Sequence, residues 1–131
     1  MEVSTWPFMT SIEMHITDNK LIQDLQEEFN SLFPYLKIEF FSITSKGKEN
    51  AKILSPLQAV GQSRKKREDG VLLLNSHMTV TAFEKEMSER FGLQVQVFRQ
   101  SGKMWIETSL TDSWTLERQN AEGYELSGKS A

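Results

Sequence analysis

The sequence predicts an α+β fold built from two similar halves, and two observations support this prediction. A histidine, an apolar residue and a threonine precede an apolar helical stripe twice, at His15 and at His77, with a constant offset of 62 residues. Each stripe is followed by an alternating run typical of a strand, at 36–41 and at 93–98. Repeated strand–helix–strand units predict a ferredoxin-like antiparallel sheet of four or five strands with helices on one face. Halves of the β-grasp type, each containing a hairpin, are the main alternative.

The chain has 131 residues, which fits a single α+β domain with one core. Its two halves are predicted at 8–44 and 70–109, and the irregular segment 45–69 joins them. Residues 123–131 are small and polar, so we expect a frayed tail there.

In the first half, the alternation over 8–16 indicates a half-buried strand. Thr17 or Asp18 can cap the following helix, and Pro34 ends it. A second strand is expected over 36–43. The helix presents one apolar stripe, made of Leu21, Ile22, Leu25, Phe29 and Leu32.

In the second half, residues 71–76 are apolar on both faces, which predicts a central strand covered on both sides. Thr81 and Glu84 match a capping box at the start of the next helix, with Thr79 as an alternative cap. Gly92 is the expected left-handed stop of that helix. Its apolar stripe consists of Phe83, Met87 and Phe91.

The runs 93–99 and 103–108 predict a hairpin with a tight turn at 101–102. This turn pairs Phe98 directly with Trp105 on the face turned away from the helices. Phe41 occupies the position equivalent to Phe98 in the first half. The predicted sheet therefore presents an aromatic face, to which Leu72 or Leu74 could add.

Three interpretations of this aromatic face compete. A homodimer or another protein could use it as an interface, since interfaces combine an aromatic centre with a polar rim. Single-stranded RNA could stack on it, although the basic and aromatic RNP1 signature is absent. Segment 45–69 or the residues around Trp114 could also cover it within the same chain. The binding surface that we predict from sequence comprises Phe41, Phe98, Trp105 and Trp114.

Charge is distributed unevenly along the chain. The net charge is −3, yet residues 45–69 hold seven basic and three acidic side chains. The negative net charge argues against a general nucleic-acid binder. Binding of a nucleic acid or another anionic ligand through the basic loop and the aromatic residues is nevertheless an alternative function. Its candidate residues are Arg64, Lys65, Lys66 and Arg67.

Catalytic and cofactor motifs are absent from the sequence. There is no cysteine, P-loop, dinucleotide fingerprint or G-x-S-x-G elbow. His15 and His77 end strands expected to be antiparallel, so they should lie too far apart to share a metal. Asp112 or Ser113 is expected to cap a last helix over 114–121. The acidic residues around Glu107 and Asp112 give only weak support to a metal-dependent enzyme. We expect no cofactor, no metal and no catalytic residue.

No signal peptide and no apolar stretch of membrane-spanning length are evident, so the expected location is the cytoplasm. The segment from Phe91 to Arg99, together with Trp105 and the run Trp114-Thr115-Leu116-Glu117, resembles a family of small uncharacterised bacterial proteins. The match is strongest over residues 80–120. This resemblance implies a compact α+β domain and provides no catalytic residues. The sequence therefore predicts a non-enzymatic interaction or self-associating module that binds through the aromatic face.

Overall fold

The computed structural model describes residues 11–42, 51–65 and 68–128, and it confirms the predicted α+β class with a ferredoxin-like order of elements. Both halves run strand, helix, strand. In chain order the elements are β1 (Ser11–Ile16), α1 (Ile22–Leu32), β2 (Leu36–Phe41), the 3₁₀ helix η2 (Val60–Ser63), β3 (Gly70–Asn75), α2 (Val80–Phe91), β4 (Gln94–Ser101), β5 (Met104–Glu107), the 3₁₀ helix η3 (Ser109–Thr111), α3 (Leu116–Gly123) and the π-helix η4 (Tyr124–Gly128).

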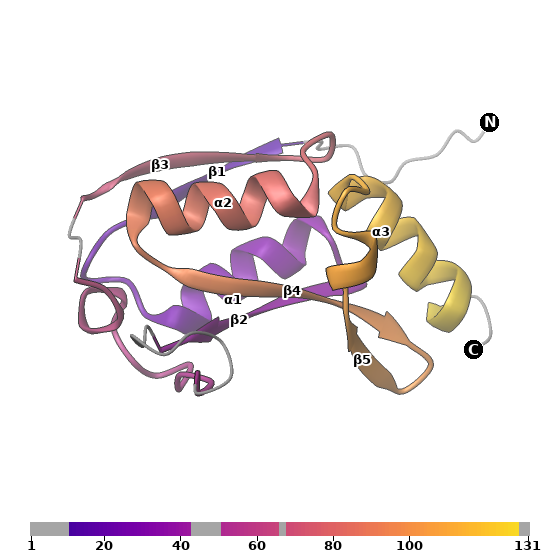
Figure 1. The fold of residues 1–131 in the computed structure, drawn as a ribbon, viewed down its shortest axis with the longest axis horizontal. Coiled ribbons are helices and arrows are strands. Elements are labelled where there is room, and N and C mark those ends of the chain that lie inside the picture. The colour runs from indigo at the N-terminus through magenta and orange to yellow at the C-terminus, as the bar shows by residue number, and fades with distance from the viewer. Residues whose placement is uncertain (1–10, 43–50, 66–67, 129–131) are drawn as a thin grey trace.

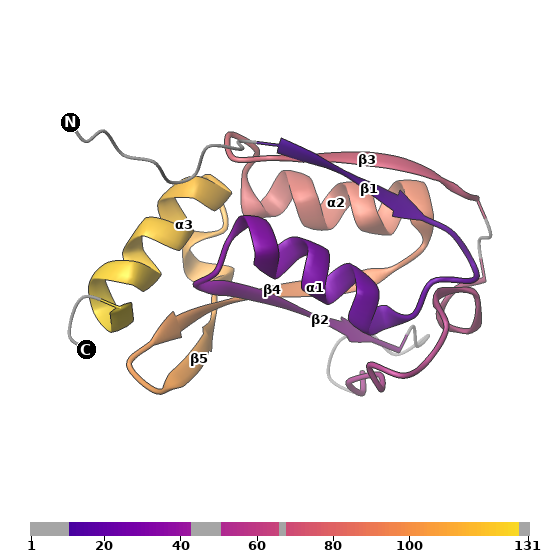
Figure 2. The same ribbon diagram turned by 180° about the vertical axis from the view of Figure 1, so that it is seen from behind.

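The strands form two antiparallel sheets, where one continuous sheet was expected. β1 pairs with β3 as a two-stranded ribbon, with Met14 opposite Leu72. β2, β4 and β5 form the second sheet, with Ile38 opposite Val97. Figures 1 and 2 show α1 and α2 between the two sheets, so each sheet has helices on one face.

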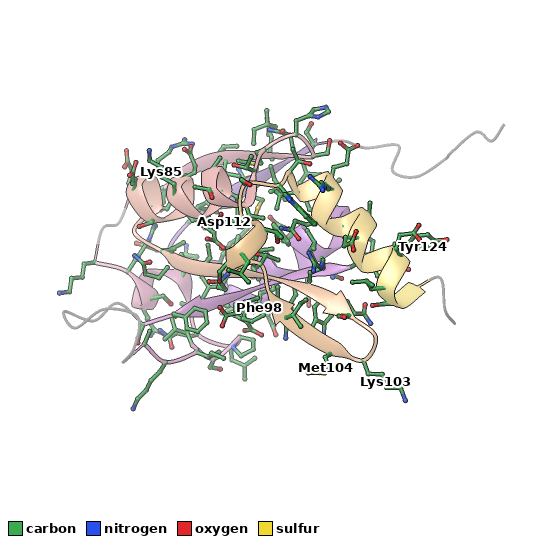
Figure 3. All side chains as sticks on the ribbon, turned by 45° about the vertical axis from the view of Figure 1, so that its right-hand side comes forward. Lys85, Phe98, Lys103, Met104, Asp112 and Tyr124 are labelled. Atoms are coloured by element: carbon green, nitrogen blue, oxygen red, sulfur yellow. The ribbon has the colours of Figure 1, made fainter. Side chains whose placement is uncertain are left out.

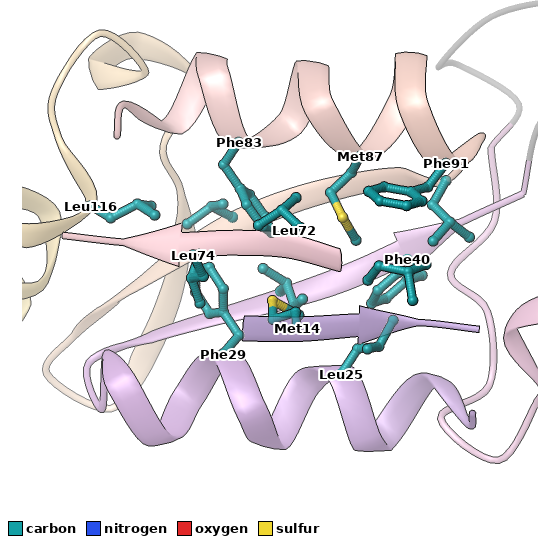
Figure 4. Packing of buried hydrophobic residues seen from close by; sticks show 14 of the residues in the cluster. Met14, Leu25, Phe29, Phe40, Leu72, Leu74, Phe83, Met87, Phe91 and Leu116 are labelled. Carbon is teal, nitrogen blue, oxygen red and sulfur yellow. The ribbon is translucent and has the colours of Figure 1, made fainter. Parts of the chain in front are cut away.

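The core lies where the two sheets and the two helices meet (Figure 4). Alternate residues of each strand and one stripe of each helix point into it, because strands repeat every two residues and helices every 3.6. Phe29 of α1 and Phe83 of α2 meet at its centre, with ring centroids 5.1 Å apart. The stripes expected from sequence are buried, including Leu25, Met87 and Phe91, except for Leu21, which precedes α1 and is half-buried.

The helix starts differ in part from those predicted. α1 begins after Leu21, whose backbone N–H donates to the Asp24 carboxylate, so Thr17 and Asp18 are not its caps. α2 uses the alternative cap, Thr79, whose hydroxyl accepts from the backbone N–H of the third helical residue. α3 is capped by Thr115, and the expected caps Asp112 and Ser113 lie before it.

The prediction that 71–76 is a strand covered on both sides is wrong. Leu72 and Leu74 are buried in the core and add nothing to a surface. Val71 and Leu73 are 37% and 55% exposed, because no described element packs on the outer face of the β1–β3 ribbon. A run of apolar residues is therefore compatible with a strand that is buried on one face alone.

The predicted register of the β4–β5 hairpin is also wrong. Phe98 pairs with Glu107 and Gln100 pairs with Trp105, so the turn residues are Gly102 and Lys103. Gly102 has φ +64°, and no described residue other than glycine has a positive φ. This suits a type II′ turn, which needs glycine at its first central position. The slip of two residues leaves Phe98 and Trp105 on the same face.

Two short segments also differ from expectation. A turn at Ser55–Gln58 precedes η2, where a helix over 56–61 was predicted. Residues Tyr124–Gly128 continue α3 as a π-helix, and Ser127 accepts a hydrogen bond from the backbone N–H of Gly102. The expected frayed tail therefore does not begin at 123; residues 129–131 lie outside the described part of the chain.

Candidate binding face on the three-stranded sheet

The aromatic face is the side of the β2–β4–β5 sheet turned away from α1 and α2. The strand register places Lys37 opposite Phe98 and Gln100 opposite Trp105. Their neighbours Leu36, Ile38 and Val97 point the other way into the core. Because strand residues alternate between faces, the pairing assigns to this face Lys37, Glu39, Phe41, Gln94, Gln96, Phe98, Gln100, Trp105 and Glu107.

Lys37 joins the two main aromatic residues of this face. Its ammonium lies 5.7 Å from the centroid of the Phe98 ring and 5.2 Å from that of Trp105. The same ammonium is 3.2 Å from a carboxylate oxygen of Glu39. Cation–π contacts at partly exposed positions contribute about 0.5–1 kcal/mol each, so Lys37 holds both rings in place. Sequence reasoning missed this lysine, although its alternate position in the 36–41 run marks it as facing the same way as Phe41.

Phe41 lies at the far end of the same face. It pairs with Ile53 in a short ladder in which Leu54 N–H donates to Phe40 and Ser42 N–H donates to Lys52. Ile53, opposite Phe41, points to the same side and is 61% exposed. The aromatic face therefore extends from Ile53 through Phe41 and Phe98 to Trp105.

No described helix covers this face (Figures 1 and 2). Figure 3 shows Phe98 on the side of the sheet away from the helices. Trp114, predicted as part of this surface or as its cover, packs instead against Arg99 and Arg118 on the helix side. The structure therefore brings together Phe98 and Trp105, adds Phe41 at one end, and separates Trp114 from them.

Side chains occupy part of the edge of this sheet at β2 and at Val97 of β4. Gln26 and Asn30 of α1 donate to the carbonyls of Ile38 and Leu36 at 2.9 and 2.8 Å. On β4, the N–H of Val97 donates to Glu84 and its carbonyl accepts from Thr108. Occupied edge positions discourage unspecific strand pairing along β2.

The predicted basic loop does not form an anion site around Arg64. This side chain is fully buried and donates to the carboxylates of Asp18 and Asp69 at 2.7 and 2.9 Å. It also donates to the carbonyls of Glu68 and Phe91. Lys65 is exposed, whereas Lys66 and Arg67 lie outside the described residues. Arg64 is thus a structural residue whose charge is already compensated.

The described residues contain no group of three or more potential metal ligands. His15 lies opposite Val71, and His77 follows Asn75 at the other end of the ribbon, as the antiparallel pairing predicted. His15 Nε2 lies 3.7 Å from a carboxylate oxygen of Glu13, and His77 Nδ1 lies 3.9 Å from one of Glu117. In the part of the chain that the structure describes, no helix has the length and apolar character that would let it cross a membrane.

A comparison with protein-family models, with curated proteins and with solved structures finds no match to this chain. The resemblance of residues 80–120 to small bacterial proteins therefore stays a prediction.

Proposed function

We propose that this protein is a non-enzymatic interaction module that associates with a second copy of itself through the aromatic face. The observation that carries this proposal is the arrangement of Phe98 and Trp105 around Lys37 on a sheet surface that none of the described helices covers. Phe41, Phe98 and Trp105 are half-buried, and partly exposed aromatic clusters with a polar surround are typical of interaction sites.

The composition of the face favours a second copy as the partner. Glutamines surround the aromatic residues at 94, 96 and 100, and Lys37 is paired with Glu39. The body of the protein is acidic, with a net charge of −3 for the whole chain. Two copies can therefore meet through this nearly neutral face with little like-charge repulsion.

The size of the face indicates a weak association. The eight residues of β4 span roughly 27 Å and three strands span roughly 14 Å, so the face covers about 400 Å² in projection. Stable interfaces bury about 800 Å² on each partner. We expect a dimer with a dissociation constant in the micromolar range or above.

The test is the solution mass of the wild type and of two double variants from about 10 μM to 1 mM, by light scattering and sedimentation equilibrium. The variant with Phe98→Ser and Trp105→Ser should fold, because both side chains lie on the outer side of the sheet. It should remain monomeric, because it lacks the aromatic centre of the proposed interface. Val71→Ser with Leu73→Ser removes two exposed apolar residues from the β1–β3 ribbon and should still dimerise.

Far-UV circular dichroism and thermal melting check that both variants are folded. A wild type that stays monomeric at 1 mM would refute self-association. Loss of dimerisation in the ribbon variant, with the aromatic variant unaffected, would show that the interface lies on the other sheet.

A further inference from the structure

A cluster of two arginines and one tryptophan lies on the helix side of β4, separate from the aromatic face. Trp114 precedes α3, and its carbonyl accepts from the N–H of Val80 at the start of α2. The guanidinium carbon of Arg118, in the first turn of α3, is 3.8 Å from the centroid of the Trp114 ring. That of Arg99, from β4, is 5.7 Å from the same centroid. The cluster therefore joins β4 to the connection between η3 and α3, a region marked by Asp112 in Figure 3.

Arg99 is fixed in position by Gln119, which is fully buried. The Gln119 side-chain oxygen accepts from Arg99 at 2.8 Å. Its amide nitrogen donates to the carbonyl and the hydroxyl of Thr111 at 2.7 and 2.8 Å. The amide is thus oriented from both ends, and Arg99 is held in one arrangement before any ligand arrives.

Neither arginine of this cluster has a carboxylate partner within the described residues. Arg64 and Arg90, by contrast, form ion pairs, Arg64 with two aspartates and Arg90 with Glu86 at 2.9 Å. The buried Nε of Arg99 has no hydrogen-bond acceptor in the described part of the chain. This Nε has almost no accessible surface, so a ligand does not reach it directly, and the unsatisfied donor leaves the charge of Arg99 incompletely compensated within the chain.

The acidic residues of α3 do not neutralise the cluster. Glu117 lies 3.9 Å from His77, and no ion pair joins Glu122 to Arg118 in spite of their i, i+4 spacing. The site therefore has two positive charges in a chain whose net charge is −3. A dianion neutralises two guanidiniums, whereas a single carboxylate does so for one.

The two distances to the Trp114 ring limit how far apart the guanidiniums can lie. Each carbon lies at a known distance from the same ring centroid, so the two can be no more than about 9.5 Å apart. Two guanidiniums that donate to one phosphate through ordinary 2.8 Å hydrogen bonds place their carbons roughly 8 Å apart. Buried Gln119 closes one side of the cluster, and exposed Arg118 leaves the other side open to a substituent.

From these observations we infer that Arg99 and Arg118, stacked on Trp114, bind the phosphate group of a small phosphate monoester. Trp114 keeps both guanidiniums in place through its ring. The N–H groups of Arg118, together with the terminal N–H groups of Arg99 that do not donate to Gln119, are the donors for the phosphate oxygens. This inference is independent of self-association, because the two sites lie on opposite faces of the sheet.

The test is a titration of the full chain with methyl phosphate, followed by the NMR signals of the Trp114 indole N–H and the Arg99 Nε–H. Sodium chloride keeps the ionic strength constant. We expect saturable shifts of both signals with wild type and at least a tenfold weaker affinity in Arg118→Gln. Arg118 is exposed on a helix, so this variant should fold.

The matched control is Arg90→Gln, which removes an exposed arginine that already has a carboxylate partner, and it should bind like wild type. The same titration is repeated with inorganic phosphate and with acetate. Equal affinity for acetate would overturn the assignment to phosphate, and binding of inorganic phosphate alone would overturn the assignment to a monoester. Shifts no larger than those caused by sodium chloride would overturn the site itself.

Discussion

Arg64→Ala should lower the free energy of unfolding by about 3 kcal/mol, because Arg64 ties together three segments that are distant in sequence. Its guanidinium joins Asp18 after β1, Glu68 and Asp69 before β3, and the carbonyl of Phe91 at the end of α2. No other described basic side chain connects so many elements. The substitution therefore tests whether a buried charge holds this end of the fold.

The magnitude follows from the exposure of each group. Removing one partner of a buried ion pair usually costs about 3–5 kcal/mol, because the other charge stays buried. Here Asp18 and Asp69 are 34% and 59% exposed, so water can solvate their carboxylates after the change. The remaining cost arises from the lost hydrogen bonds and the lost packing of a fully buried side chain, which places the value at the lower end.

Urea denaturation followed by circular dichroism measures this difference, and for a chain of this length it corresponds to a fall in melting temperature of roughly 10 °C. The control is Arg90→Ala, whose ion pair with Glu86 is exposed at i, i+4 spacing. It should cost no more than about 0.5 kcal/mol. A loss below about 1 kcal/mol in Arg64→Ala, or a loss equal to that of the control, would refute the structural role assigned to Arg64.

Two glycine substitutions test close approaches between distant segments. In Gly61→Ala the new Cβ would lie 2.8 Å from the Asp18 side chain, so Asp18 must move and stability should fall by about 1–3 kcal/mol. In Gly123→Ala the new Cβ would lie 2.8 Å from the Cβ of Tyr35, so α3 should move away from the start of β2. The loss of stability should be similar to that of Gly61→Ala, although alanine has a better helix propensity than glycine. A shift of α3 weakens the hydrogen bond that the Tyr35 N–H donates to Asn120, so the amide proton of Tyr35 should exchange faster.

Both glycine predictions have controls within the same elements. Gln62→Ala and Ala121→Ser alter exposed neighbours and should change stability by less than about 0.5 kcal/mol. Gly61→Ala should also cost less when Arg64 is already alanine, since the hydrogen bonds from Arg64 then no longer resist the movement of Asp18. Additive effects in that double variant would show that Gly61 acts through something other than Asp18.

The order of elements could be predicted because it depends on local patterns. Strand and helix periods, Pro34, and Gly92 as a left-handed stop with φ 69° each act within a few residues of chain. The face shared by Phe98 and Trp105 was predictable for the same reason, since a register error of two residues preserves the alternation. The hairpin register was not, because Ser101–Gly102 and Gly102–Lys103 are both plausible turns until the backbone conformation of Gly102 is known.

The candidate sites depend more strongly on tertiary structure. A run such as Arg64-Lys65-Lys66-Arg67 looks like an exposed basic patch in sequence, yet Arg64 is buried because Asp18, 46 positions earlier, folds against it. Likewise, nothing near Arg99 in sequence indicates that Trp114 and Arg118 stack beside it.

The sequence by itself thus determined the α+β class, the two strand–helix–strand halves and, except in β3, the side of each strand that enters the core. These features follow from the spacing of apolar residues, which local backbone geometry converts directly into faces. Tertiary structure decided how the strands divide between two sheets, which charges are neutralised, and which aromatic residues remain accessible. Those outcomes depend on contacts between residues far apart in the chain, and no local pattern encodes which distant partner each side chain meets.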